Sequence, residues 1–231
     1  MIIKNFKSEE PQTPFAPKWN YLIAESHVGV KDVDYWKEVR NLILEKEQQI
    51  ISSTEPTKTD GAETLDGYTG LGENSLTSRF NAFNVLKWQY DILNPIRGAI
   101  KKSYLEVLDT CGLKREKCWV QCWANVMRKG EQIKPHLHSV TPYSYLGGHI
   151  HVTHNNTSTF YINPVNQINE PEIYESKNEP GKLTIFQSCI PHYTSINNDE
   201  HERITIAFDF VLDRQPNTNK GNMYLIDEGE K

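Results

Sequence analysis

The sequence predicts a mainly β fold with flanking helices. Short runs of alternating or β-branched residues, separated by turn signals, fill the second half of the chain, which is typical of a sandwich, a barrel or a jelly roll. Two apolar patterns with helical spacing occupy the first half. The 231 residues fit one domain. We expect helical and loop support over residues 1–116, a β core over 117–213 and a polar tail over 214–231, where fraying is expected from about Gln215.

The first 30 residues contain two apolar runs, so we expect a strand near the amino terminus and a second at about residues 20–24. A loop should separate them, since the chain between is punctuated by Pro11, Pro14 and Pro17. A helix over about residues 33–52 should follow, with Asp32 as its N-cap. Its buried stripe is predicted to contain Val33, Trp36, Val39, Leu42, Ile43 and Ile50.

Residues 54–81 are rich in Gly, Thr, Asp and Asn and predict a long loop. It is either a surface loop or a lid over a substrate, and a lid would use Tyr68, Arg79 or Phe80. A second helical pattern runs over about residues 88–111 and should stop at Gly112. Pro95 marks either a break in it or the first turn of its longer part.

Residues 118–127 alternate as a strand does, with Gln121 and Asn125 on a face suited to a polar cavity. Cys118 and Cys122 lie on the other, small apolar face, and we expect buried thiols there rather than a zinc site. Further strands are predicted over 147–153 and 158–162, paired as a hairpin, and over 182–187, 192–196 and 203–211.

Charge and hydropathy restrict the partners of this chain. The net charge of −5 with scattered basic residues does not indicate an obligate nucleic-acid partner. Because the apolar runs are short and the amino terminus lacks a signal-peptide core, we expect a cytoplasmic protein without a membrane span.

His136 and His138 are separated by one residue on an extended segment, so their side chains project to one side. Together with His192 from a distant strand they could occupy one face of a coordination shell and leave the other face open. Open positions are what Fe(II) oxygenases require, since oxygen and a co-substrate both bind the iron.

Arg203 and Thr205 also share one face of a strand, which begins eleven residues after His192. An arginine with a neighbouring hydroxyl is well suited to hold a carboxylate. Taken alone, Arg203 would be interpreted as a solvent-facing charge. His149 and His151 follow a Gly-Gly step and either line the same cavity or face solvent, whereas His27, His154 and His201 are interpreted as ordinary polar residues.

These motifs together resemble the Fe(II)- and 2-oxoglutarate-dependent oxygenases, especially prolyl-hydroxylase-like members and phage and bacterial oxygenases of that type. Their pattern is a glycine, His-x-Asp, a distal His, then a basic residue followed after one position by Ser or Thr. The matching positions are Gly130, His136-Leu137-His138, Pro191-His192 and Arg203-Ile204-Thr205. The resemblance spans residues 117–211 and implies a double-stranded β-helix (jelly roll) core beneath the helical layer.

The resemblance also implies functions for individual residues. His136, His138 and His192 would bind Fe(II), and Arg203 would bind the far carboxylate of 2-oxoglutarate with support from Thr205. Asn125 and His151 are further candidates for co-substrate contacts. The co-substrate would be converted to succinate and carbon dioxide while an unknown peptide or small-molecule substrate is hydroxylated or otherwise oxidised.

One position departs from the pattern, because His138 stands where the family has Asp or Glu. It would be a neutral third ligand, or point away from a two-histidine site, or mark a loss of activity; we favour the first. Two other functions stay open: a three-histidine cupin-like dioxygenase or isomerase that does not use 2-oxoglutarate, and a jelly-roll binding module with structural histidines.

Overall fold

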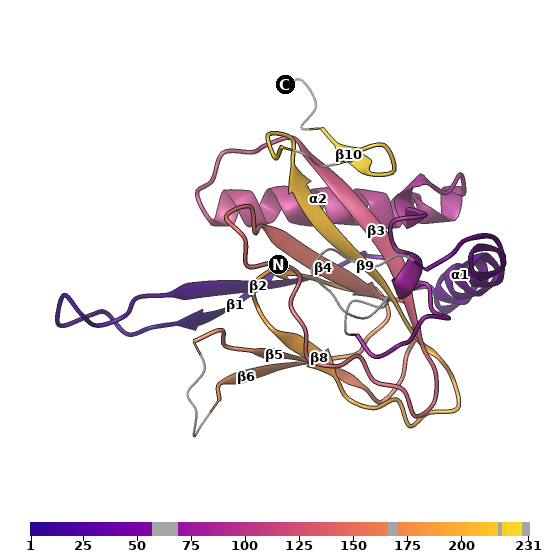
Figure 1. The fold of residues 1–231 in the computed structure, drawn as a ribbon, viewed down its shortest axis with the longest axis horizontal. Coiled ribbons are helices and arrows are strands. Elements are labelled where there is room, and N and C mark those ends of the chain that lie inside the picture. The colour runs from indigo at the N-terminus through magenta and orange to yellow at the C-terminus, as the bar shows by residue number, and fades with distance from the viewer. Residues whose placement is uncertain (57–68, 166–170, 217–218, 228–231) are drawn as a thin grey trace.

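The computed structural model describes residues 1–56, 69–165, 171–216 and 219–227. Within them the chain forms two antiparallel sheets and two α-helices (Figure 1). The seven-stranded sheet has the order β1-β2-β7-β4-β9-β3-β10, and the three-stranded sheet has the order β6-β5-β8. The strands are β1 (Ile2–Lys7), β2 (Asn20–His27), β3 (Cys118–Met127), β4 (Leu146–His151), β5 (Ser158–Ile162), β6 (Ile173–Lys177), β7 (Lys182–Gln187), β8 (His192–Thr194), β9 (Arg203–Leu212) and β10 (Tyr224–Ile226).

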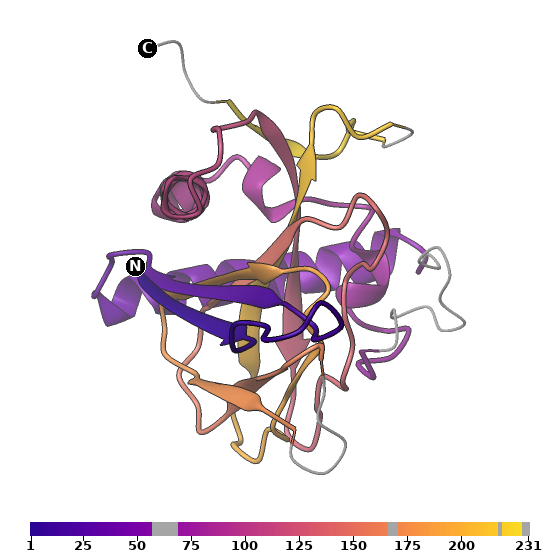
Figure 2. The ribbon, with the colours of Figure 1, turned by 90° about the vertical axis from the view of Figure 1, so that its left-hand side faces the viewer.

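The helices are α1 (Val33–Ser53) and α2 (Asn94–Thr110), with three 3-10 turns at Thr77–Arg79, Val85–Lys87 and Asp91–Leu93. Figures 1 and 2 both place the small sheet at the end of the molecule opposite α2. The arrangement confirms the predicted mainly β fold with flanking helices. None of these helices is long and apolar enough to cross a membrane.

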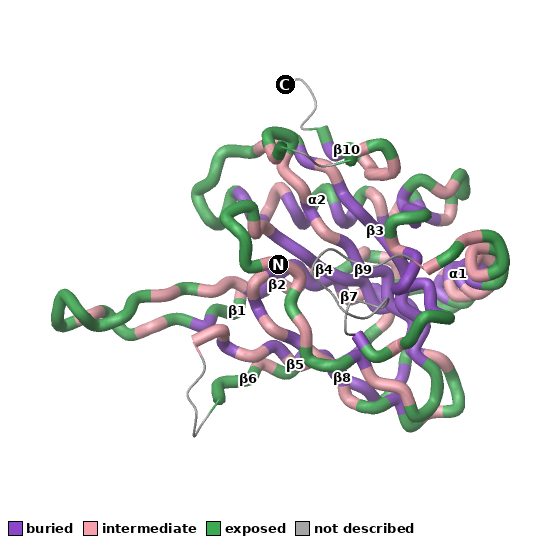
Figure 3. Tube along the Cα trace, in the orientation of Figure 1, coloured by how far each residue is buried: buried purple, intermediate pink, exposed green. Residues whose placement is uncertain are grey.

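Strand alternation divides the large sheet into two faces. On β7, Ile185 packs in the core formed with the helices, whereas the next residue, Phe186, packs in a smaller cluster toward β5. That inter-sheet cluster consists of Phe6, Ile23, Tyr161, Phe186 and Ile190. Buried residues concentrate along the central strands, whereas the β1–β2 hairpin is exposed over most of its length (Figure 3). The face directed away from the helices therefore builds the interior between the sheets.

Helix α1 begins where the sequence predicts, because the Asp32 side chain accepts a hydrogen bond from the amide of Asp34 at 2.9 Å. Helix α2 begins later than the predicted residue 88. Pro95 lies in its first turn, where no amide donor is needed, and Trp88 is extended. The chain leaves α2 at Gly112, whose φ of 65° favours glycine.

The predicted hairpin between residues 147–153 and 158–162 is wrong. β4 pairs with β7 and β9 in the large sheet, whereas β5 pairs with β6 and β8 in the small one. The connection between β4 and β5 therefore carries the chain from one sheet to the other. Two further strands were not predicted, β6 and β10, and β10 ties part of the expected polar tail to β3.

The long loop is described only in part, and Tyr68 lies outside the described residues. Arg79 is buried and donates to the carbonyl oxygens of Thr54 and Ser75 at 2.9 and 3.2 Å, so it braces the loop. Phe80 lines the cavity described below. Of the candidate lid residues, Arg79 is thus structural and Phe80 is placed to contact a ligand.

Candidate metal centre and adjoining cavity

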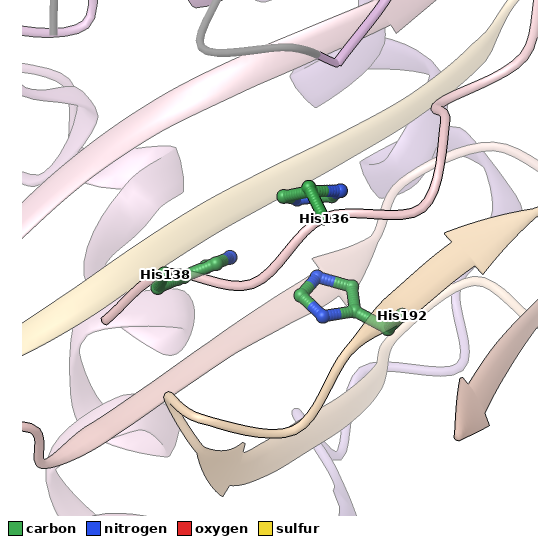
Figure 4. Close-up of side chains that lie close together, drawn as sticks. All are labelled: His136, His138 and His192. Carbon is green, nitrogen blue, oxygen red and sulfur yellow. The ribbon is translucent and has the colours of Figure 1, made fainter. Parts of the chain in front are cut away.

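His136, His138 and His192 converge in the interior between the sheets. Each offers one ring nitrogen, and these three atoms lie within 4.8 Å of one another. The ring centroid of His192 lies 4.3 Å from that of His136 and 5.1 Å from that of His138. Figure 4 shows the rings of His136 and His138 on one segment and the ring of His192 opposite them. The predicted triad is therefore brought together.

Backbone pairing holds the two histidine segments in register. The amide of His136 donates to the carbonyl oxygen of His192 at 3.0 Å, and the reverse bond measures 2.9 Å. The amide of His138 donates to the carbonyl oxygen of Ser188 at 2.9 Å. The backbone of each histidine is thus held by a hydrogen bond from its own amide.

Each imidazole also has its Nδ1 engaged by an acceptor. Nδ1 of His136 donates to the carbonyl oxygen of Lys134 at 2.8 Å, and Nδ1 of His192 donates to that of Ile190 at 3.1 Å. Nδ1 of His138 donates to Oδ1 of Asp209 at 2.5 Å. Because these acceptors fix the proton on Nδ1, Nε2 of each ring carries a lone pair for a metal ion. Three convergent neutral donors fit a divalent transition metal such as Fe(II).

The protonation of the three rings differs because their surroundings differ. Burial, together with the neighbouring His138, lowers the pKa of His136 to about 4. Burial also lowers the pKa of His192 well below 6.5, helped by the two other triad rings. Burial acts in the same direction on His138, but the charge and hydrogen bond of Asp209 outweigh it and raise the pKa.

A cavity of about 140 Å³ adjoins the three rings. A single water needs about 10–15 Å³ on the same measure, so a molecule of several heavy atoms has room. One strand supplies a row of its walls: alternate residues of β9 line the cavity, whereas the residues between them pack against the helices. That row consists of Arg203, Thr205, Ala207 and Asp209.

Arg203 is buried at 2% exposure, which excludes the solvent-facing interpretation. Its guanidinium donates to Oγ1 of Thr159 at 2.9 Å. Among the described residues its Nε has no hydrogen-bond partner, and no carboxylate lies within ion-pair distance of the guanidinium. Burial lowers the pKa of Arg203 to about 10, so it is a cation at neutral pH. A buried cation of this kind calls for an anion, and a carboxylate entering the cavity would supply one.

Thr205 and Asn125 are partners in the β3–β9 register, and both line the cavity. Oδ1 of Asn125 accepts from Thr77 at 2.6 Å and from Trp123 at 3.1 Å, which directs its amide group. His151 lies deeper than predicted: it is fully buried and is not among the lining residues, while His149 is. The centroids of these two rings are 4.9 Å apart.

The other sequence candidates lie outside this cluster. Gln121 is buried and donates to the carbonyl oxygen of Phe83 at 3.2 Å, so it supports the loop. His27 bonds to the backbone, and His154 and His201 are exposed. All four cysteines are free, and Cys118 and Cys122 are buried against the helices.

Asp209 is the residue that the sequence interpretation missed. The alternation that pairs Arg203 with Thr205 continues along β9 and would have placed Asp209 on the cavity face. Its hydrogen bond to His138 joins residues 71 positions apart, which no local pattern predicts.

Residues 121–209 match the family model described as "Putative 2OG-Fe(II) oxygenase". The match contains the three convergent histidines, Arg203 and Thr205. The chain has no match among curated proteins.

Solved structures with a similar fold include a Pseudomonas putida prolyl-4-hydroxylase, at 10% identity and a TM-score of 0.54, with 82% of this chain and 92% of that one covered. A Trichoplax adhaerens prolyl hydroxylase in complex with a hypoxia inducible factor peptide has 10% identity and a TM-score of 0.53, with 83% of each chain covered. A viral collagen prolyl hydroxylase from Paramecium Bursaria Chlorella virus-1, in a 2OG complex, has 7% identity and a TM-score of 0.50, with 81% of this chain and 94% of that one covered.

The predicted resemblance to the Fe(II)- and 2-oxoglutarate-dependent oxygenases is confirmed by these matches, as is the jelly-roll core. The cofactors of this class are Fe(II) and 2-oxoglutarate, and the convergent histidines and buried arginine suit them.

Proposed function

We propose that this 2-oxoglutarate-dependent non-haem iron oxygenase hydroxylates or otherwise oxidises a peptide or small-molecule substrate and releases succinate and carbon dioxide. His136, His138 and His192 would hold Fe(II), and the chain 1–231 would act as one domain. β1 and β2 join the same sheet as the strands that carry the site, which supports a single unit.

One observation carries this proposal: a buried arginine without a carboxylate partner among the described residues shares a cavity with three convergent histidines. A dicarboxylate that chelates a metal at one end and carries a charge at the other would satisfy both. 2-Oxoglutarate has this structure.

The cavity residues would divide the work of holding 2-oxoglutarate. Arg203 would bind its far carboxylate through two N–H groups, with the hydroxyls of Thr205 and Thr159 beside it. Asn125 would donate from its amide, whose oxygen is already engaged by Thr77 and Trp123. His151 would act from behind His149 and keep that ring in place.

Bound Fe(II) and 2-oxoglutarate supply the oxidising chemistry, and the chain positions the substrate and limits water. Leu137 lines the cavity and is 41% exposed, so the cavity reaches the surface beside the segment that carries His136 and His138. Phe80 and Trp123 form an aromatic wall, with centroids 5.6 Å apart. A substrate entering past Leu137 would meet this apolar wall next to the metal.

The test is succinate formation and oxygen uptake with Fe(II), ascorbate and 2-oxoglutarate, with binding of metal and co-substrate recorded on the same samples. We expect the wild type to bind both and to form succinate, slowly without its substrate. His192→Ala should lose the metal, and Arg203→Ala should lose 2-oxoglutarate alone.

The outcomes separate the alternatives. Iron binding without 2-oxoglutarate binding would favour a three-histidine, cupin-like enzyme. If neither binds, the histidines are structural and the protein is a binding module.

A further inference from the structure

The metal site has three neutral ligands where the resembling oxygenases use two histidines and a carboxylate. Three imidazoles would leave a bound divalent ion one unit more positive than that ligand set does. A metal-binding histidine becomes a more basic ligand when an acceptor, such as a carboxylate, takes a hydrogen bond from its other ring nitrogen. The acceptors of the three Nδ1 hydrogen bonds therefore determine how much of the missing negative charge at the metal is compensated.

Those groups are not equivalent. His136 and His192 donate to backbone carbonyl oxygens, which are neutral. His138 alone donates to a carboxylate, at 2.5 Å. His138 is also the ring that stands at the carboxylate position of the family pattern. Among the described residues, Asp209 is the only carboxylate that lines the cavity.

The fold leaves room for this pair at one position, Gly147 on β4. Gly147 lies opposite Asp209 in the β4–β9 register. A Cβ at Gly147 would lie 2.8 Å from Oδ1 of Asp209 and 2.9 Å from Nδ1 of His138, closer than real contacts allow. The absence of a side chain there is what permits the carboxylate to reach the ring.

We propose that Asp209 is a positioning residue that supplies, through the ring of His138, the negative charge which a carboxylate ligand would otherwise bring to the metal. This inference rests on the metal site of the proposed function. It assigns the His138–Asp209 pair, with Gly147, as one unit that replaces a single Asp ligand. Asp209 orients the ring toward the metal and makes its Nε2 a stronger donor.

Asp209→Asn is the informative variant, because the asparagine oxygen can still accept from Nδ1 of His138 while the charge is removed. Co(II) serves as the probe, in anaerobic titrations followed by absorbance. We expect Co(II) affinity to fall by about 10- to 100-fold, the range for loss of such a partner. The matched control is Asp213→Asn, which removes the same charge at a residue that bonds to Trp119 outside the cavity, and it should change affinity less than about twofold.

A second readout reports charge rather than affinity. In samples saturated with Fe(II) and 2-oxoglutarate, the band that reports electron transfer from iron to 2-oxoglutarate should move to shorter wavelength in Asp209→Asn. A less negative environment lowers the energy of the filled iron d orbitals, so the transition requires more energy. A purely structural role would weaken binding without moving the band.

A third comparison uses His138→Asp, which restores the family ligand. In that background Asp209→Asn should no longer reduce Co(II) affinity, since the metal receives its carboxylate directly. An equal loss in both backgrounds would overturn the proposal, because it would assign a structural role to Asp209.

The remaining results also overturn it. Unchanged affinity and an unmoved band in Asp209→Asn would show that the charge does not reach the metal. If Asp209→Ala abolishes Co(II) binding while His138→Ala retains it, Asp209 is itself the ligand. Failure of the wild type to bind Co(II) would overturn this inference and the proposed function together, whereas Co(II) binding without the 2-oxoglutarate band would overturn only the proposed function.

Discussion

The cavity has two ends that differ in how their polar groups are satisfied. The metal end consists of His136, His138 and His192, and the inner end consists of Arg203 with the buried His149 and His151. At the metal end, each histidine has its Nδ1 engaged by an acceptor of the chain, and one ring nitrogen of each histidine lies within 4.8 Å of those of the other two. At the inner end, Arg203 lines the cavity, and its Nε has no hydrogen-bond partner among the described residues. The chain therefore supplies hydrogen-bond partners for the rings at the metal end, whereas the guanidinium of Arg203 at the inner end is left for a ligand.

This difference explains why the metal could bind at one end without 2-oxoglutarate binding at the other. A metal needs only Nε2 lone pairs, which the surrounding hydrogen bonds prepare in advance. A buried guanidinium is costly until an anion pairs with it, so the inner end gains most from its ligand. Variants at the two ends should accordingly separate metal affinity from 2-oxoglutarate affinity.

The largest effect is expected from His192→Ala at the metal end. Removal of a ligand should lower Co(II) affinity by more than about 100-fold, since loss of an outer partner alone costs about 10- to 100-fold. The matched control is His201→Ala, an exposed histidine outside the site. Isothermal titration with Co(II) measures both, and retained affinity in His192→Ala would contradict the assigned triad.

At the inner end, Arg203→Met should lower 2-oxoglutarate affinity by about 100-fold, because a buried charged contact is lost. Co(II) affinity should stay near that of the wild type, which is what distinguishes the two ends. Arg214→Met, at an exposed arginine paired with Glu116, is the control. Equal losses of metal and co-substrate would mean that the two ends do not act separately.

Gly147→Ala tests the metal end with a single methyl group. The added Cβ would press on both Asp209 and His138, so we expect Co(II) affinity to fall by about tenfold, within the range for disturbed outer partners. Gly98→Ala, in α2 with no atom within 4 Å of the added Cβ, should leave Co(II) affinity unchanged and stabilise the helix by about 1 kcal/mol. Titration and thermal unfolding distinguish the two.

The smallest effect is a pH dependence set by the inner end. Burial lowers the pKa of His149 to about 3 and that of His151 well below 6.5. Below pH 6.5 these histidines are protonated in the unfolded chain but stay neutral in the folded protein. The free energy of unfolding should therefore fall as the pH falls from 6.5 toward 3. The slope is at most about 1.4 kcal/mol per pH unit for each ring.

Urea unfolding of the metal-free protein at several pH values measures this slope. His149→Gln should reduce it, whereas His154→Gln, at an exposed histidine, should not. His138 contributes with the opposite sign, because its raised pKa adds stability at low pH that is lost as pH rises through the folded value. A slope unchanged in His149→Gln would contradict the buried neutral state of this ring.

The parts of the site that could be predicted are those set by local geometry. The spacing of His136 and His138, and of Arg203 and Thr205, follows from strand alternation and holds in the structure. The cap of α1 at Asp32 is equally local.

What could not be predicted depends on contacts between distant segments. The pattern before and after the Asn155-Asn156 turn fits a hairpin, yet β4 and β5 enter different sheets because their partners lie elsewhere in the chain. For the same reason, neither the pairing of β10 with β3 nor the bond from His138 to Asp209 could be read from sequence. His151 lies on the same face of β4 as His149, as strand alternation predicts. It is nevertheless fully buried and does not line the cavity, because packing determines how deep each side chain lies.

An anaerobic titration of 2-oxoglutarate into the Fe(II)-loaded protein, followed by visible absorbance, tests directly whether the cavity holds the co-substrate against the metal. We expect a charge-transfer band that saturates with 2-oxoglutarate in the wild type. The band should be absent in His192→Ala, because that variant does not bind iron, and in Arg203→Met it should need about 100-fold more co-substrate. Bound iron with no band at any concentration of 2-oxoglutarate would contradict this expectation, because the two ends of the cavity would then not be holding one molecule between them.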